Sequence, residues 1–187
     1  MRPSGKKTRN TDAEHSVHGV LIDVYGVGVL MRGPSGIGKS ECALDLIARG
    51  HRLVSDDLVL LRKEANGDVF GFPPEGTHHH LEVRGLGLLN IFHLYGAASV
   101  RDLKKIDMVL ELVPFDEVVG IERVGIEVLS TRLMDSDLPW IRVPCWKGRN
   151  LTTIIEVAAR NQILRWSGYD SALEFEKRHT ERLCESS

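Results

Sequence analysis

The sequence predicts an α/β domain organised around a phosphate-binding loop. Three observations carry this prediction. A glycine-rich segment at 33–40 reads Gly-Pro-Ser-Gly-Ile-Gly-Lys-Ser, short β-rich runs fill the first two thirds of the chain, and the last third has helical periodicity. Strands that alternate with helical segments favour an α/β architecture over an all-helical or all-β one.

The glycine-rich segment follows an apolar run at 27–31 and precedes a stretch with helical spacing. This is the strand–loop–helix context in which G-x-x-x-x-G-K-[ST] binds nucleotide phosphates. Glycines let backbone N–H groups close on phosphate oxygens, and the helix adds its positive N-terminus. Lys39 would reach the β- and γ-phosphates, and Ser40 would offer its hydroxyl to Mg²⁺. The candidate nucleotide-binding residues are Gly33, Pro34, Ser35, Gly36, Ile37, Gly38, Lys39 and Ser40.

Composition indicates a soluble protein with one full core. The chain has 187 residues, 42% of them hydrophobic, and a formal net charge of -2. Without a basic excess, nucleic acid is not the expected partner. No apolar run approaches the roughly 18 residues that cross a bilayer, so no membrane is expected either. Three well-separated cysteines, Cys42, Cys145 and Cys184, suit a reducing cytoplasm better than a disulfide framework.

The first part of the chain divides into an arm and a folded region. Residues 1–13 are polar and aperiodic, which predicts a disordered arm or a remnant of cloning, and residues 14–187 are expected to form a single domain. Runs at 20–24 and 27–31 predict two strands joined by a turn at Tyr25-Gly26. The helix after the loop should place Ala43, Leu46 and Ile47 on one buried face.

Two adjacent carboxylates follow the next predicted strand. The segment 51–57 ends in Asp56 and Asp57, at the strand end where open α/β sheets bind ligands. One acid could orient Mg²⁺ while the other takes a proton from an attacking hydroxyl. Adjacent residues point to opposite sides, so the sequence leaves open which does which. Two solvated turn carboxylates are the alternative, which the apolar Leu53-Val54 disfavours.

The middle of the chain predicts a hairpin and an extended segment. Runs at 58–61 and 69–72 flank an Asn66-Gly67-Asp68 turn. At 81–84, Glu82 and Arg84 alternate with apolar residues and should share one face. The preceding run, 78–80, is three histidines; neighbouring side chains diverge, which favours a polar loop over a metal site.

The second half predicts further strands and two terminal helices. Residues 88–96 indicate a short helix or an apolar loop, and strands are expected at 106–113, 126–129 and 140–143. A loop at 144–150 precedes a helix with Ile155 and Ala159 on its apolar face. The last helix should begin at Ser171, which with Glu174 matches a capping box.

Several motifs together resemble the catalytic domain of HPr kinase/phosphorylase. They are Val17-His18-Gly19-Val20, GPSGIGKSE (33–41), Ser55-Asp56-Asp57, HLEVRGLGLLN (80–90) and GRNLTTIIEVAARN (148–161). The similarity runs from about residue 15 to about residue 170. It implies a P-loop kinase core of the phosphoenolpyruvate carboxykinase-like type, a mixed sheet with flanking and C-terminal helices. It also implies a homohexamer and an N-terminal domain that this chain lacks.

The resemblance implies a bifunctional enzyme. Members of this family phosphorylate a serine of the phosphocarrier protein HPr with ATP and Mg²⁺. They reverse the modification by phosphorolysis, which yields pyrophosphate, and so regulate carbohydrate uptake through the phosphotransferase system. The alternatives are a related kinase with another protein or small-molecule acceptor, and a nucleotide sensor without catalysis. The retained Asp57, Glu82 and Arg123 speak against the sensor.

Residue roles also follow from the resemblance. Asp57 is similar to the family's proton acceptor, Lys39 to its catalytic lysine, and Ser40 and Glu82 to its Mg²⁺ ligands. His18 and Arg123 match the remaining active-site positions. The segment 144–149 corresponds to one linked to dephosphorylation, and there Cys145-Trp146-Lys147 departs from the family pattern. Retention of phosphorylase activity is therefore left open.

Overall fold

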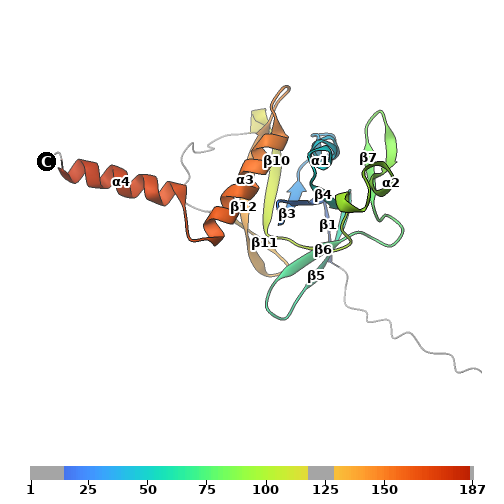
Figure 1. The fold of residues 1–187 in the computed structure, drawn as a ribbon, viewed down its shortest axis with the longest axis horizontal. Helices are drawn as coiled ribbons and strands as arrows, with labels where there is room; N and C mark the ends of the chain where they lie inside the picture. Colours follow the sequence, from blue (N-terminus) through green and yellow to red (C-terminus); the bar gives the residue numbers. More distant parts are fainter. Residues whose placement is uncertain (1–14, 118–128, 186–187) are drawn as a thin grey trace, which may run out of the picture.

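The computed structural model describes residues 15–117 and 129–185, and it has a six-stranded mixed sheet at its centre (Figure 1). The strand order is β11-β12-β10-β3-β2-β4. These strands are β2 (Val20–Val24), β3 (Val27–Arg32), β4 (Arg52–Ser55), β10 (Met108–Pro114), β11 (Ser130–Leu133) and β12 (Ser136–Cys145). β10 is parallel to β3 and β12, whereas β2 is antiparallel to both β3 and β4. The prediction of an α/β fold with a mixed sheet is confirmed.

Smaller elements surround this sheet. A four-stranded sheet has the order β1-β5-β6-β9, and β7 and β8 form a separate hairpin. Their bounds are β1 (His15–His18), β5 (Leu58–Lys63), β6 (Val69–Phe72), β7 (His80–Val83), β8 (Gly87–Asn90) and β9 (Lys104–Lys105). The helices are α1 (Lys39–Ala48), α2 (Ile91–Tyr95), α3 (Leu151–Trp166) and α4 (Ser171–Glu185), with 3₁₀ turns η1 (Ala97–Ser99) and η2 (Phe115–Glu117). None of the described helices is long and apolar enough to span a membrane.

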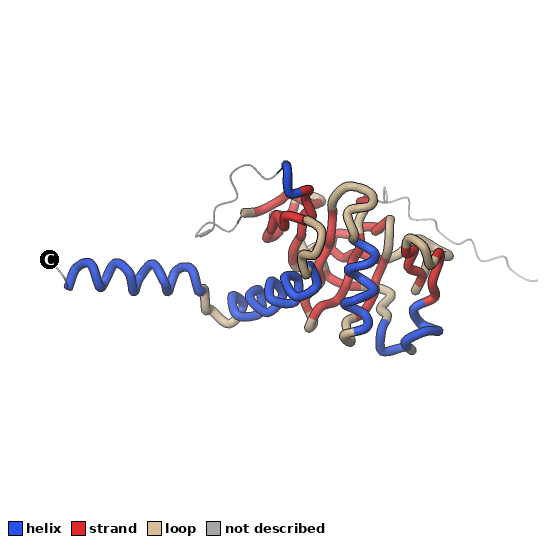
Figure 2. The backbone as a smooth tube through the Cα atoms, turned by 90° about the horizontal axis from the view of Figure 1, so that it is seen from above, coloured by secondary structure: helices blue, strands red, loops and turns tan. Residues whose placement is uncertain are grey.

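The central strands are buried on both faces, which explains their nearly continuous apolar sequence. Side chains alternate between the faces, so Val20 and Ile22 of β2 join the cluster that includes Leu46 of α1 and Ile155 of α3. Leu21, between them, points the other way and packs in the cluster formed with β5 and β6. Two helices therefore cover one face of the sheet (Figure 2), and the four-stranded sheet packs against the other.

Strand direction decides which loops meet. β3 and β4 run the same way, and β2 runs between them in the opposite direction. Three segments consequently lie at the same end of these strands: the segment after β3, the segment after β4 and the residues before β2. The glycine-rich loop, Asp56-Asp57 and His18 are thus neighbours, although they are far apart in the sequence.

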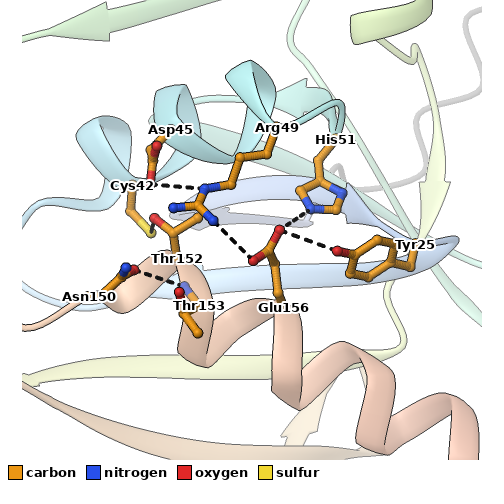
Figure 3. Close-up of polar contacts among 9 residues, drawn as sticks. All are labelled: Tyr25, Cys42, Asp45, Arg49, His51, Asn150, Thr152, Thr153 and Glu156. Atoms are coloured by element: carbon orange, nitrogen blue, oxygen red, sulfur yellow. Dashed lines mark hydrogen bonds and ion pairs between the residues drawn. The ribbon is translucent and has the colours of Figure 1, made fainter.

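Glu156 of α3 joins the two helices that cover the sheet (Figure 3). Its carboxylate lies 3.1 Å from His51 Nε2, accepts a hydrogen bond from the Tyr25 hydroxyl at 3.3 Å, and lies 3.5 Å from Arg49 Nη1. His51 is 4% exposed and the Glu156 side chain 15% exposed. Nearby, Cys42 of α1 contacts the Thr152 hydroxyl, and burial raises the pKa of its thiol to about 11.

Glu156→Ala is expected to lower the free energy of unfolding by about 1–3 kcal/mol, because it leaves the buried His51 ring without its carboxylate partner. Urea denaturation measures this change. Glu64→Ala is the matched control: Glu64 pairs with Arg62 on the surface, where both side chains are about half exposed, and such pairs contribute about 0–1 kcal/mol. Equal losses in the two variants would contradict the role of the Glu156 cluster.

The C-terminal helices differ in one detail from the prediction. The acceptor that caps α4 is Asp170, whose Oδ1 accepts from Ala172 N at 2.9 Å, so the predicted cap at Ser171 is wrong. α4 extends away from the rest of the molecule in both views (Figures 1 and 2). It carries exposed apolar side chains, Leu173 and Phe175 among them.

The remaining differences lie in short elements. Residues 88–96 contain the end of β8 as well as the helix α2, where the sequence indicated only a helix or loop. Strands β1 and β11 were not predicted. Polar side chains occupy most of both, so neither shows a strong apolar pattern. Most of the strand expected at 126–129 falls outside the described residues.

Candidate active site

A cleft of about 480 Å³ opens at the end of the strands where these three segments meet. It is lined by the glycine-rich loop, the turn after β4, the residues before β2 and the β7–β8 hairpin. The lining residues are His18, Gly19, Gly33, Ser35, Gly36, Gly38, Lys39, Ser40, Glu41, Asp56, Asp57, Glu82 and Arg84. Five of the predicted single-residue candidates, His18, Lys39, Ser40, Asp57 and Glu82, lie together here.

The glycine-rich loop has the tight backbone that its sequence predicts. Gly33 adopts φ 138°, and a Cβ at this position would lie 2.4 Å from the carbonyl oxygen of Leu112, so only glycine fits. Lys39 folds back over the loop, and its Nζ donates to the carbonyls of Gly33 at 2.8 Å and Pro34 at 3.0 Å. The ammonium group is therefore held at the loop, where a phosphate could exchange for these two carbonyls.

Asp56 links the loop to the hairpin. Ser40 Oγ donates to its Oδ1 at 3.2 Å, and the backbone N–H of Glu82 donates to its Oδ2 at 2.9 Å. Burial raises the pKa of the Asp56 carboxyl, and these hydrogen bonds oppose that effect. Both oxygens of Asp56 thus accept hydrogen bonds from within the protein, so this carboxylate is suited to position the loop and the hairpin relative to each other.

Asp57 has the opposite character. It adopts a left-handed backbone conformation, φ 64°, and its carbonyl accepts from Gly19 N at 3.0 Å. The side chain is 85% exposed and contacts His18, whose Nδ1 lies 3.7 Å from Asp57 Oδ1. The turn thus directs one of two adjacent carboxylates inward and leaves the other open to the cleft.

The raised pKa of Asp56 predicts a specific pH dependence. The folded protein keeps a proton on this carboxyl at pH values where the unfolded chain, with a pKa of about 3.9, has lost it. Stability should therefore fall as the pH rises through this window, relative to Asp56→Asn, which has no such proton. Denaturation of both proteins in Mg²⁺-free buffer from pH 4 upward tests this. A stability difference between them that stays constant with pH would contradict it.

The β7–β8 hairpin places two charged side chains over the loop. Leu81 and Val83 are buried, so Glu82 and Arg84 share the exposed face, as the alternation predicted. A Cβ on Gly36 would lie 3.1 Å from Arg84 Nη2, which puts the guanidinium beside the loop. Sequence reasoning did not assign Arg84 to the site. The signal available was its place on the same face as Glu82.

The oxygen donors in the cleft fit Mg²⁺. The Ser40 hydroxyl and the carboxylate of Glu82 line the same cleft, and Asp56 is within hydrogen-bond distance of Ser40. Hard oxygen ligands of this kind, completed by phosphate oxygens and waters, are what Mg²⁺ prefers. Arg123 falls within residues 118–128, outside the described part of the chain.

The loop that follows β12 comprises residues 146–150, because the first two residues of the loop predicted at 144–150 belong to the strand. There the Arg149 guanidinium lies 4.2 Å from the centre of the Trp146 ring, and Phe115 of η2 contacts the same ring edge-on at 5.2 Å. Trp146 nevertheless remains 49% exposed. The unusual Cys145-Trp146-Lys147 sequence therefore presents an aromatic surface, with a cation stacked on it.

This fold and this cleft define the class: an α/β nucleotide-binding protein with a P-loop, in which carboxylates face the phosphate site. A family model described as the HPr serine kinase C-terminal domain matches residues 10–179. The chain belongs to this family.

Relatives and a solved structure agree. The HPr kinase/phosphorylase of Geobacter sulfurreducens is 52% identical over 167 residues, which cover 89% of this chain and 52% of the relative. That of Brevibacillus brevis is 46% identical over 170 residues, covering 91% and 55%. The structure of the HPr(Ser) kinase/phosphatase from Coxiella burnetii matches with a TM-score of 0.78 and 30% identity, over 87% of this chain and 98% of that one. The chain thus spans about half the length of the curated relatives it matches.

Proposed function

We propose that this domain transfers the γ-phosphoryl group of ATP to a serine of the phosphocarrier protein HPr and reverses the modification by phosphorolysis. The observation that carries the proposal is the pairing of a P-loop with Asp57, an exposed carboxylate facing the same cleft. A site that only binds nucleotide has no need of a base open to an acceptor. The names of the relatives supply the acceptor.

In the forward direction each group has a chemical task. The loop amides and Lys39 hold the donor phosphates, and Asp57 takes the proton from the serine hydroxyl as its oxygen attacks the γ-phosphorus. Ser40 and Glu82 would hold Mg²⁺, which neutralises charge on the phosphate oxygens when bound. His18, in contact with Asp57, orients the carboxylate. The products are phosphoserine, ADP and a proton.

In the reverse direction inorganic phosphate attacks the phosphoserine phosphorus. The serine oxygen leaves and takes a proton from the same Asp57, and pyrophosphate is released. We assign the acceptor-phosphate contact to Arg123 and assign a part in this direction to the loop at 144–149. Trp146 makes that loop bulkier than the family pattern. The rate of phosphorolysis is therefore a more sensitive test of the loop's role than the rate of phosphorylation.

The proposal includes the setting of the domain. We propose that it works in the cytoplasm, as part of a homohexamer, and that residues 14–187 act as a single catalytic unit after a non-catalytic arm at 1–13. Sedimentation of the purified protein tests the hexamer. A monomer at micromolar concentration would rule out the homohexamer and leave the proposed phosphoryl transfer unaffected.

Incubation with labelled ATP, Mg²⁺ and purified HPr tests the function directly. Mass spectrometry should find one phosphoserine on HPr, and added phosphate should release pyrophosphate from it. ATP hydrolysis without labelling of HPr would instead favour a different acceptor. Labelling of HPr without release of pyrophosphate would support the kinase activity and exclude the phosphorylase activity.

A further inference from the structure

Two adjacent histidines and one aspartate meet outside the cleft. The ligand-type atoms of His78, His79 and Asp102 all lie within 4.8 Å of one another. His79 Nε2 is 3.0 Å from Asp102 Oδ1, and His78 Nδ1 is 3.6 Å from the same oxygen. The sequence had favoured a polar loop here because neighbouring side chains diverge. In the structure these two converge.

The backbone explains the convergence. His79 adopts φ 65°, the left-handed region, which breaks the alternation of side chains along an extended segment. Such a conformation is unfavourable for a non-glycine residue and persists only where its surroundings fix it. Here the carbonyl of His79 accepts from Ile91 N at 2.8 Å, and its ring stacks on Phe92 at 5.5 Å.

The third histidine is used differently, which separates it from the cluster. His80 Nδ1 lies 2.8 Å from the carbonyl of His78, and its Nε2 lies 3.4 Å from Asn90 Nδ2. Both ring nitrogens are thus engaged within the protein. His78 and His79, by contrast, direct a ring nitrogen to one point beside an exposed carboxylate.

We infer that His78, His79 and Asp102 form a binding site for a divalent transition-metal ion of the zinc type. Ligands 2.0–2.2 Å from a tetrahedral ion are about 3.4 Å apart. The observed separations of 3.0 and 3.6 Å from the carboxylate oxygen bracket this value. Two imidazoles and a carboxylate suit Zn²⁺ or Co²⁺, whereas Mg²⁺ prefers oxygen ligands throughout. Water would complete the coordination, since the cluster is open to solvent.

The proposed metal site lies where a bound ion would link two segments of the chain. It joins the segment before β7 to the segment after η1, and β7 carries Glu82 two residues beyond His80. A bound ion would fasten the base of the β7–β8 hairpin, beside α2 in Figure 1. The inference stands independently of the proposed function, because it concerns residues that do not line the cleft.

Titration with Co²⁺, followed by visible absorption and then by displacement with Zn²⁺, tests the site. We expect one ion per chain, not displaced by millimolar Mg²⁺, and a higher melting temperature with Zn²⁺. His79→Asn, which tolerates the left-handed backbone, and Asp102→Asn should each weaken binding about tenfold or more. His93→Gln is the matched control, an exposed histidine on neighbouring α2 outside the cluster, and should bind as the unaltered protein does.

Two results would overturn the inference. One is binding that both cluster variants leave unchanged, which would place the ion elsewhere. The other is the absence of saturable Co²⁺ binding in the unaltered protein, which would leave an ordinary histidine–aspartate ion pair. Melting of each variant without metal separates loss of the site from loss of the fold.

Discussion

Asp57→Asn is expected to lower kcat for phosphoryl transfer by about 10²–10⁴-fold, the usual contribution of a positioned general base. Nucleotide affinity should change little, because the loop residues that would bind phosphate keep their contacts. Asparagine also tolerates the left-handed backbone at φ 64°, so the fold should be retained. Single-turnover transfer from labelled ATP and separate nucleotide titration measure the two effects.

Asp135→Asn is the matched control for this variant. Asp135 has the same residue type, a left-handed φ of 58° and an 85% exposed side chain, but it does not line the cleft. It should transfer phosphate at the unaltered rate. If Asp57→Asn also retains full turnover while Asp56→Asn does not, the assignment of the base to Asp57 is wrong.

Lys39→Met is expected to reduce transfer by about 10²–10³-fold, the scale seen when one preorganised charge or donor is removed from a reacting oxygen. The ammonium group is already held at the loop by the carbonyls of Gly33 and Pro34. Methionine keeps the length and the apolar stem but offers nothing to the phosphates. ATP affinity should fall as well, in contrast to Asp57→Asn.

Lys63→Met controls for the loss of a lysine that donates to a backbone carbonyl. Lys63 Nζ donates to the Met134 carbonyl at 2.9 Å, and Lys63 is not among the residues of the cleft. Unchanged transfer is expected. A Lys39→Met protein with normal kcat and only a raised KM would show that Lys39 binds nucleotide without acting on the transferred group.

Local patterns predicted most of the scaffold. The glycine-rich loop and the helix α1 follow from residues adjacent in sequence, where apolar periodicity and glycine placement suffice. His18 is different: its neighbours give no signal, and the resemblance alone pointed to it. It reaches the cleft because β1 pairs antiparallel with β5, a strand about 40 residues further along the chain, which sets His18 opposite Leu58 and beside Asp57.

Two other features depended on backbone detail. Alternation placed Glu82 and Arg84 on one face, yet the contact of Arg84 with the loop needs the hairpin to fold over it. The meeting of His78 and His79 depends on the positive φ of His79, a conformation that is uncommon in non-glycine residues even though histidine is enriched in it. Neither could be deduced from spacing alone.

The pairing of β1 with β5 also bears on how the protein folds. His18 and Asp57 are 39 residues apart, and the pairing of β1 with β5 brings them together by placing His18 opposite Leu58. Contacts of such sequence separation carry a loop-closure cost and slow the search for the native state. Nucleotide should therefore bind the completed sheet and not its precursors. Bound nucleotide would then stabilise the folded state by RT ln(1 + L/Kd), where L is the free nucleotide concentration, so the melting temperature should keep rising with nucleotide concentration even after the site is saturated.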